Sequence, residues 1–206
     1  IVHGSILAIA GILVRIRGML YIIPVVNIIG SEGNGIYGAA FNIYNIMLVL
    51  SSYGLPMAVS KLVSARFTKK RYKSAAKVLR CSFMVAVCTG GIAALLVFFG
   101  ASFIENVIYG GGLPGLAVPL RILAPTIFLV AILGVIRGFL QGQSTMIPTA
   151  VSQILEQIVN AIVSIAAGYG MMKAFASSPD VAAYGAAGST LGTAMGALTA
   201  VLFMGF

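Results

Sequence analysis

The chain of 206 residues is poor in the residues that carry enzyme chemistry: it has one histidine, two cysteines, four acidic residues and no tryptophan. Catalysis would need a nucleophile with its base, a metal cluster or paired carboxylates. His3 has no cysteine or acidic neighbour at ligand spacing, and Cys81 and Cys88 stand too far apart on one predicted helix for a disulfide. We therefore predict no catalytic residue, metal or cofactor, and we expect both cysteines to pack as small apolar residues.

Charge is also scarce, and most of it is of one sign. Charged residues make up 8% of the chain and hydrophobic residues 60%, which is typical of a chain whose solvent is lipid. The net charge of +9 taken alone would suit nucleic-acid binding, but seven of the thirteen basic residues lie in one stretch, so we expect no nucleic-acid partner. This pattern predicts a cytoplasmic loop that contacts anionic lipid headgroups. The loop contains Arg66, Lys69, Lys70, Arg71, Lys73, Lys77 and Arg80.

Long apolar runs, separated by glycine, proline, serine and charged residues, divide the sequence into membrane-spanning segments. We expect an all-α integral membrane protein with six transmembrane helices, near residues 4–29, 36–64, 78–103, 118–140, 147–172 and 183–206. The chain begins at Ile1 and ends within an apolar run, so we interpret it as a piece of a longer protein.

The connections between the predicted helices indicate an orientation. Residues 30–35 and 105–115 carry acid and no base, so we expect both connections outside the cell. The basic loop then faces the cytoplasm, and so does the amino terminus. Arg137 agrees with this orientation, whereas Lys173 does not.

Arg15 and Arg17 lie near the middle of the first apolar run. A guanidinium at that depth is costly unless it faces protein, water or an anion, so we expect a polar cavity beside this helix. The planar fork of arginine suits phosphate and carboxylate oxygens. Residues two apart point roughly 200° away from each other on a helix, so the two arginines do not both face one cavity.

Polar residues on the second and fifth predicted helices also share faces. The fifth helix carries a stripe at helical spacing, formed by Gln153, Glu156, Gln157, Asn160 and Ser164. The second helix carries Asn42 and Asn45, and Pro56 should interrupt it. Such residues line a cavity, or they join helices by hydrogen bonds.

Glu156 is the one acidic residue predicted at depth. We expect it to line the cavity or to form an ion pair, and one alternative is that it only neutralises Arg15 or Arg17. On the sixth helix, glycines recur every three or four residues, a pattern that indicates close helix packing and no ligand role. These are Gly185, Gly188, Gly192 and Gly196.

Four sequence runs resemble a known family of membrane proteins. The runs GSEGNGIY at 30–37 and GLPMAVSKLV at 54–63 resemble the polysaccharide-transporter branch of the multidrug/oligosaccharidyl-lipid/polysaccharide flippase superfamily. The runs RGFLQG at 137–142 and PTAVSQILEQ at 148–157 are similar to the stage V sporulation protein B group, which is related to MurJ-type lipid II flippases. The resemblance covers essentially the whole chain.

The resemblance implies a fold and an activity. It implies a MATE-like transporter with about fourteen helices in two lobes, of which this chain is most of the N-terminal lobe and lacks the C-terminal lobe. It also implies a multi-pass flippase of the bacterial cytoplasmic membrane, not an enzyme. The implied substrate is a lipid-linked diphosphate sugar, used for cell-wall, spore-cortex or polysaccharide synthesis, with a coupling cation or the membrane potential biasing the cycle.

The resemblance also implies site residues. Arg15, which precedes Gly18, matches a basic cavity position of the family. A second basic position is absent from the run YIIP at 21–24, which leaves Arg17 as its possible replacement. The polar groups Asn42, Asn45, Gln153, Glu156, Gln157 and Asn160 would line the sugar path.

Two other functions stay open on the sequence alone. A cation-coupled multidrug exporter of the same fold would make Glu156 its central residue, because acidic groups suit cationic drugs. A non-transporting scaffold for cell-wall enzymes would use the basic loop as its docking surface.

Overall fold

The computed structural model describes the backbone of residues 2–205 and the side chains of residues 23–205. All regular secondary structure in this part of the chain is helical. The elements are α1 (Val2–Ser51), α2 (Gly54–Thr68), α3 (Tyr72–Phe103), the π-helical turn η1 (Ile104–Ile108), α4 (Ala117–Gly142), α5 (Ile147–Ala174) and α6 (Val181–Gly205).

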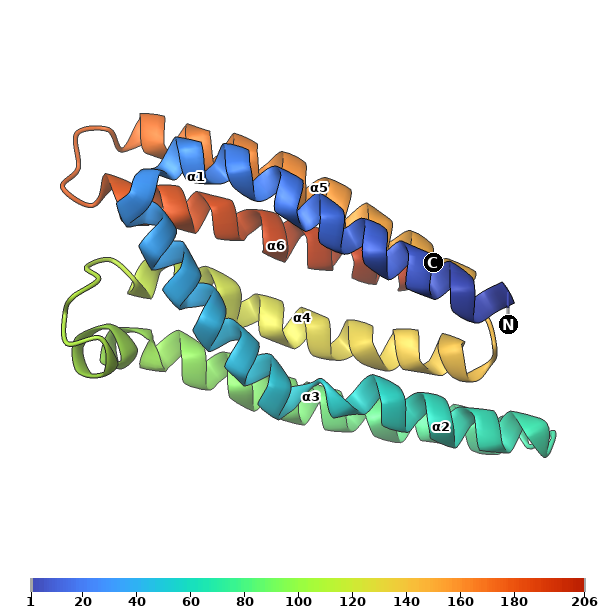
Figure 1. Cartoon of the computed structure of the whole chain (residues 1–206). Helices are drawn as coiled ribbons and strands as arrows, with labels where there is room; N and C mark the ends of the chain where they lie inside the picture. The colour runs from blue at the N-terminus through green and yellow to red at the C-terminus, as the bar shows by residue number, and fades with distance from the viewer. Residues whose placement is uncertain (1, 206) are drawn as a thin grey trace.

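Helix α1 is bent at Gly30, where the chain changes direction sharply (Figure 1). Gly30 has φ 72° and ψ −177°, a conformation that residues with a side chain rarely adopt. We expected a connection over residues 30–35, and this was wrong in extent, because the helix resumes directly after Gly30. After the bend, Gly33 lies close to the start of α6, where an added Cβ would lie 3.2 Å from the Ala182 carbonyl oxygen.

The predicted interruption near Pro56 is confirmed. Helix α1 ends at Ser51, and α2 begins at Gly54, so Pro56 occupies the first turn of the new helix. Proline is tolerated in a first turn because its missing N–H would have no partner within the helix there. The single predicted helix over 36–64 is therefore two helical pieces. The four later predicted helices correspond to α3, α4, α5 and α6.

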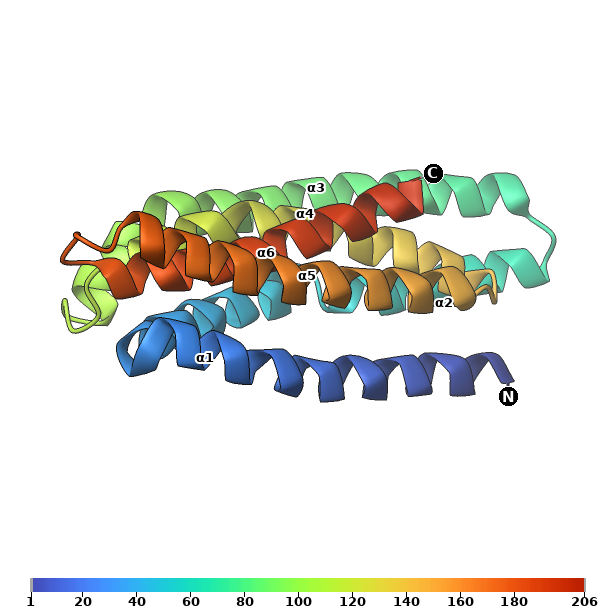
Figure 2. The same ribbon diagram turned by 90° about the horizontal axis from the view of Figure 1, so that it is seen from above.

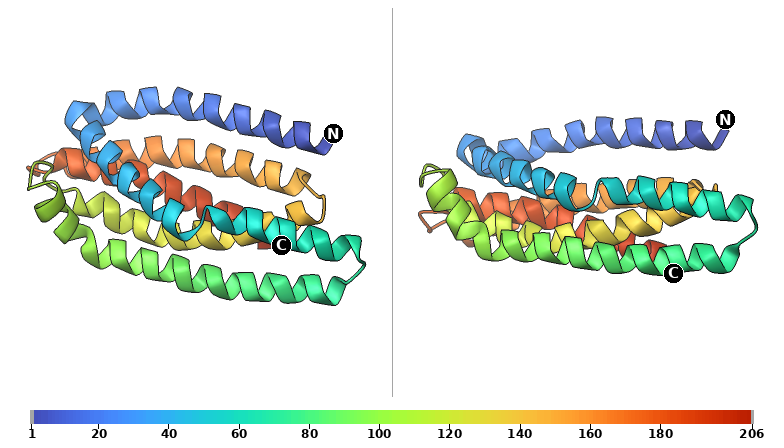
Figure 3. Two further views of the ribbon diagram at one scale, coloured as in Figure 1. Left: turned by 60° about the horizontal axis from the view of Figure 1, so that its bottom comes forward. Right: turned by 90° about the horizontal axis from the view of Figure 1, so that it is seen from below.

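Most of the helices run along one common direction and form an elongated bundle, which the part of α1 after Gly30 crosses obliquely (Figures 1 and 2). The amino terminus, the α2–α3 turn and the α4–α5 turn lie at one end. The bend at Gly30, the α3–α4 connection and the α5–α6 connection lie at the other end, in every view (Figure 3). The predicted basic loop was wrong in extent, because only residues 69–71 lie between α2 and α3. Arg66 is in α2, and Lys73, Lys77 and Arg80 are in α3, so the basic stretch forms the tip of a helical hairpin. The two connections that carry acid lie at the opposite end.

The outer faces of the bundle are apolar. Large side chains such as Met57, Leu50 and Phe99 are 78%, 75% and 76% exposed, which is expected when lipid covers them. Five helices of the described part are long and apolar enough to cross a membrane, counting residues 23–68 as one. The chain is therefore a multi-pass membrane protein. Cys81 and Cys88 are free and lie on the exposed surface of α3, so the expectation that they pack inside was wrong.

The α3–α4 connection is held by a carboxylate. Glu105 accepts hydrogen bonds from the backbone N–H groups of Gly115 and Ala117, at 3.0 and 2.7 Å. These donors stand at the amino-terminal end of α4, where helix N–H groups lack partners within the helix and favour negative charge. Glu105 is therefore a cap for α4, and Gly110, Gly111 and Gly115, which all have positive φ, supply the turns of this loop.

Candidate functional site

A pocket of about 300 Å³ lies between the α1–α2 junction and the helices α4 and α5. Its walls are largely apolar, with polar groups from α4, α5 and the α1–α2 junction. The lining residues are Leu48, Ser52, Tyr53, Pro56, Val130, Gly134, Arg137, Gln141 and Gln153. A concave apolar site with a few converging polar groups is the usual form of a small-ligand site.

Close packing of α2 on α4 shapes one wall of this pocket. Gly134, Gly138 and Gly142 recur every four residues along α4 and face α2. A Cβ added at Gly138 would lie 2.5 Å from the Pro56 carbonyl oxygen, and one at Gly142 would lie 2.8 Å from that of Ser60. Small residues at this spacing let two helix backbones approach each other. This approach brings the Ser52–Pro56 junction next to Arg137.

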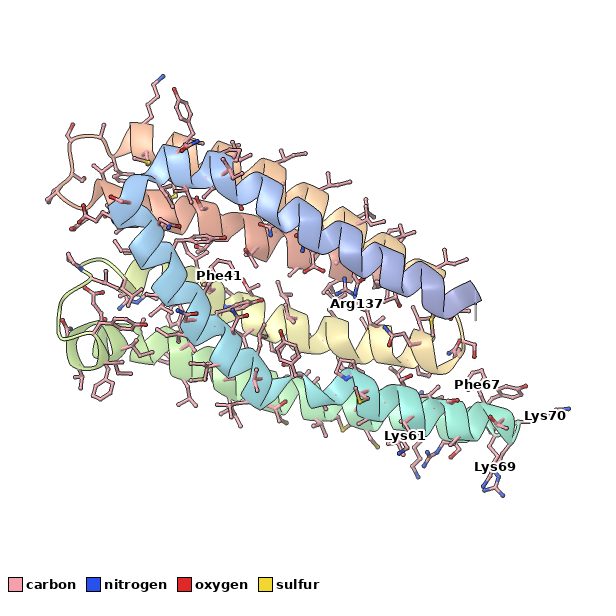
Figure 4. All side chains as sticks on the ribbon, viewed as in Figure 1. Phe41, Lys61, Phe67, Lys69, Lys70 and Arg137 are labelled. Carbon is pink, nitrogen blue, oxygen red and sulfur yellow. The ribbon has the colours of Figure 1, made fainter. Side chains whose placement is uncertain are left out.

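Arg137 is the charged residue that lines the pocket. It points from α4 toward the neighbouring helices (Figure 4), and its Nη2 donates to Glu156 Oε2 on α5 at 2.7 Å. Its Nε donates to Ser152 Oγ at 3.1 Å, and Ser152 in turn donates to the Thr149 carbonyl at 2.8 Å. The side chains of Arg137 and Glu156 are only 16% and 19% exposed.

Glu156 therefore has a partner that the sequence analysis did not name. An ion pair was one of the two expected roles, and the structure confirms it, with Arg137 instead of a first-helix arginine as the observed partner. It is the one ion pair among the described side chains. Pairing favours both charges at depth because each satisfies the other in a medium of low dielectric.

The predicted polar stripe of α5 divides between two roles. Gln153 lines the pocket, Glu156 holds Arg137, and Gln157 is half-buried without lining the pocket. Asn160 instead accepts a hydrogen bond from Ser164 at 2.9 Å, and Ser164 contacts the Ser189 carbonyl of α6 at 2.8 Å. The carboxy-terminal part of the stripe thus joins α5 to α6. Joining helices by hydrogen bonds was the predicted alternative to lining a cavity.

Two predicted site residues of the described part, Asn42 and Asn45, do not line this pocket. Asn42 and Asn45 are exposed on the second half of α1. The side chains of Arg15 and Arg17 lie outside the described residues, so their predicted roles stay predictions.

Sequence reasoning missed Arg137 and Gln141 as pocket residues. Arg137 was interpreted only as a marker of orientation, because it stands near the end of a predicted span. Its spacing from Gln141 places the two on one helix face. This spacing, together with the glycines that recur every four residues on α4, was the feature of the sequence that could have indicated a pocket.

A second hollow continues from the pocket along α2. Its volume is about 490 Å³, and it shares Tyr53, Pro56 and Gln141 with the pocket. It adds the polar groups Ser60, Lys61 and Ser64. A polar track therefore leads from Arg137 toward Lys61, which stands nearer the basic end of α2 (Figure 4).

Comparison with known proteins identifies the family of this chain. Residues 3–205 match the family described as polysaccharide biosynthesis protein. The chain belongs to this family. No solved structure matches the chain.

Three proteins of Bacillus subtilis (strain 168) are similar to this chain. Lipid II flippase MurJ is 34% identical over 78% of this chain and 31% of its own length. Stage V sporulation protein B is 29% identical over 97% of this chain and 37% of its own length. The uncharacterized membrane protein YabM is 29% identical over 98% of this chain and 36% of its own length. The chain spans about a third of the length of these relatives.

Proposed function

We propose that the full-length protein is a flippase that moves a lipid-linked sugar precursor across the bacterial cytoplasmic membrane. The names of two relatives support a role in cell-wall or spore-wall synthesis. In this proposal the chain is most of the amino-terminal lobe, with six transmembrane helices, of a two-lobe transporter with about fourteen. Alternating access would expose the site to each side in turn.

The observation that carries the proposal is the position of Arg137 in the pocket. Its Nε and Nη2 groups are used by Ser152 and Glu156, which fix the orientation of the guanidinium plane. The pocket lies open beside this plane and also offers Ser52, Gln141 and Gln153 as hydrogen-bonding groups. The sugar of such a substrate needs several hydrogen-bonding groups of this kind, and because Glu156 balances the charge of Arg137, we assign the cation for the diphosphate to Arg15.

Arg15 is proposed as the principal diphosphate ligand, with Arg17 as a second base, because of its match to the family position. Asn42, Asn45 and Gln157 are proposed to line the sugar path in the complete protein. The basic loop is proposed to lie in the cytoplasm with the amino terminus, and a cation gradient or the membrane potential to bias the cycle.

The pairing of Glu156 favours this function over a multidrug exporter. A site for cationic drugs would need an available carboxylate, whereas Glu156 lies 2.7 Å from the Arg137 guanidinium. The net charge that faces the pocket is therefore not negative. The proposed function moves a substrate without making or breaking a covalent bond, so we propose a transporter and not an enzyme.

Complementation tests the proposal. The full-length protein should restore growth to a strain depleted of its lipid II flippase, and Arg15→Ala should abolish the rescue at equal membrane abundance. Lys173→Gln, which removes an exposed cation at the far end of α5, is the control and should rescue fully. Unchanged rescue by Arg15→Ala would remove Arg15 from the site, and drug resistance without precursor translocation would favour the exporter.

A further inference from the structure

Another pocket lies at the tip of the α2–α3 hairpin, separate from both the site around Arg137 and the hollow along α2. Its volume is about 300 Å³. Arg66 and Leu62 of α2 form one wall, and one face of α3 forms the other. The residues from α3 are Ser74, Lys77, Val78, Cys81 and Ser82.

Arg66 is held in place instead of extending freely into solvent. Its Nε donates to Ser74 Oγ at 3.1 Å, and its Nη1 donates to the Leu62 carbonyl at 3.0 Å. Neither bond uses Nη2. Because two hydrogen bonds already orient the side chain, a ligand that binds Nη2 does not have to order it. Lys77 adds a second cation on the opposite wall.

Among the described side chains, no carboxylate forms an ion pair with the cations at this tip. The sequence contains no acidic residue between Glu32 and Glu105. The one ion pair of the described side chains, Arg137 with Glu156, belongs to the other pocket. Lys69 and Lys70 extend from the same tip of the hairpin (Figure 4). An anion bound between Arg66 and Lys77 would therefore meet uncompensated positive charge.

The lining of the pocket combines polar and apolar groups. Leu62 is 47% exposed, and Val78 and Cys81 line the same space. A free phosphate ion gains nothing from such a wall, whereas a lipid places its acyl chains along it.

We propose that this pocket binds the phosphodiester of an anionic glycerophospholipid, with Arg66 and Lys77 as its charge contacts and Ser74 as a hydroxyl donor. The lipid would fix the hairpin tip at the headgroup layer. This site goes beyond the proposed translocation and does not depend on it, because none of its lining residues belongs to the pocket of Arg137.

Native mass spectrometry of the purified full-length protein tests the site. The protein in detergent is titrated with phosphatidylglycerol and with phosphatidylcholine, and the bound lipid is counted. The double variant Arg66→Gln and Lys77→Gln should weaken phosphatidylglycerol binding about tenfold. The matched control is Lys73→Gln with Arg80→Gln, which also removes one lysine and one arginine from the hairpin but leaves the pocket lining intact. It should weaken binding less than about twofold.

Two competitors distinguish other sources of phosphate. Inorganic phosphate and undecaprenyl diphosphate are each added to the complex with phosphatidylglycerol, and neither should displace it at equal concentration. Displacement by inorganic phosphate would overturn the lipid assignment and show that the pocket binds free anions. Displacement by undecaprenyl diphosphate would assign the pocket to a diphosphate lipid. Equal loss of binding in both double variants would show only diffuse attraction and would overturn the site.

A measurement on the unaltered sequence supplements the variants. Cys81 lines the pocket, whereas Cys88, seven residues along the same helix, does not. Phosphatidylglycerol should slow alkylation of Cys81 by N-ethylmaleimide about fivefold or more relative to Cys88, as read by peptide mass spectrometry. Equal slowing of both thiols would contradict binding in this pocket.

Discussion

At the residue scale, the central feature is the pairing of Arg137 with Glu156. The two residues come from different helices and are each mostly buried, at 16% and 19% exposure. Removing one partner leaves the other charge without compensation at depth, which costs more than losing an ordinary hydrogen bond. The pair therefore holds α4 and α5 together and also sets the charge of the pocket.

Single and double substitutions of the pair test this role. Arg137→Gln and Glu156→Gln should each lower the free energy of unfolding by about 2 kcal/mol, and the double variant should lose less than the sum. Thermal unfolding of the purified full-length protein in detergent measures the effect. Lys173→Gln removes one exposed charge from α5 and should leave the melting temperature unchanged. Strictly additive losses would mean that the two side chains do not interact in the folded protein.

At the element scale, glycine decides which helices approach each other. The predicted close packing of α6 is confirmed, since Gly185, Gly188, Gly192 and Gly196 are all buried. A Cβ added at Gly188 would contact the Ala167 carbonyl oxygen of α5, and one at Gly196 would lie 2.6 Å from that of Glu156. The same device joins α4 to α2. Lipid supplies no hydrophobic force between helices, so short backbone distances and the contacts that they permit stabilise the bundle.

Two glycine substitutions separate packing from helix propensity. Gly188→Ala should lower the free energy of unfolding by about 1–3 kcal/mol, because its methyl group meets backbone that cannot rotate away. Gly170→Ala on α5 is the control, since an added Cβ there has open space around it and alanine favours the helix by up to about 1 kcal/mol. Thermal unfolding in detergent compares them. A Gly188→Ala protein as stable as the Gly170→Ala protein would refute the close α5–α6 contact.

At the scale of the whole molecule, the connections are sorted between the two ends of the bundle. The α2–α3 and α4–α5 turns share one end, and the α3–α4 and α5–α6 connections share the other (Figure 1). The first end carries the basic tip and the second carries Glu105 and Asp180. This separation of charge agrees with the proposed orientation, in which the basic end faces the cytoplasm.

Labelling of single cysteines tests that orientation. Cysteines are introduced into the full-length protein without native cysteines, at Lys69 and Thr145 for one end and at Pro114 and Ser177 for the other. All four positions are exposed. An impermeant maleimide should label the cysteines at Pro114 and Ser177 in intact cells, and those at Lys69 and Thr145 only after the membrane is permeabilised. Labelling of the Lys69 and Pro114 positions from the same side would contradict the arrangement.

Much of this protein follows from its sequence alone. Hydropathy determines the membrane class and the approximate extent of α3 to α6, because lipid requires long, internally bonded helices. Periodicity determines that Gln153, Glu156 and Asn160 share a face, and that the glycines of α6 form a contact surface. The family was also recognisable from its sequence runs.

Only the tertiary structure decided which faces meet. It bends α1 at Gly30 alone, pairs Glu156 with Arg137, places Asn160 in the α5–α6 contact and opens the pocket between α4 and the α1–α2 junction. Helical periodicity shows which side chains point the same way, but it does not show which neighbouring helix they reach. That choice depends on where glycine lets two backbones approach and where proline restarts a helix.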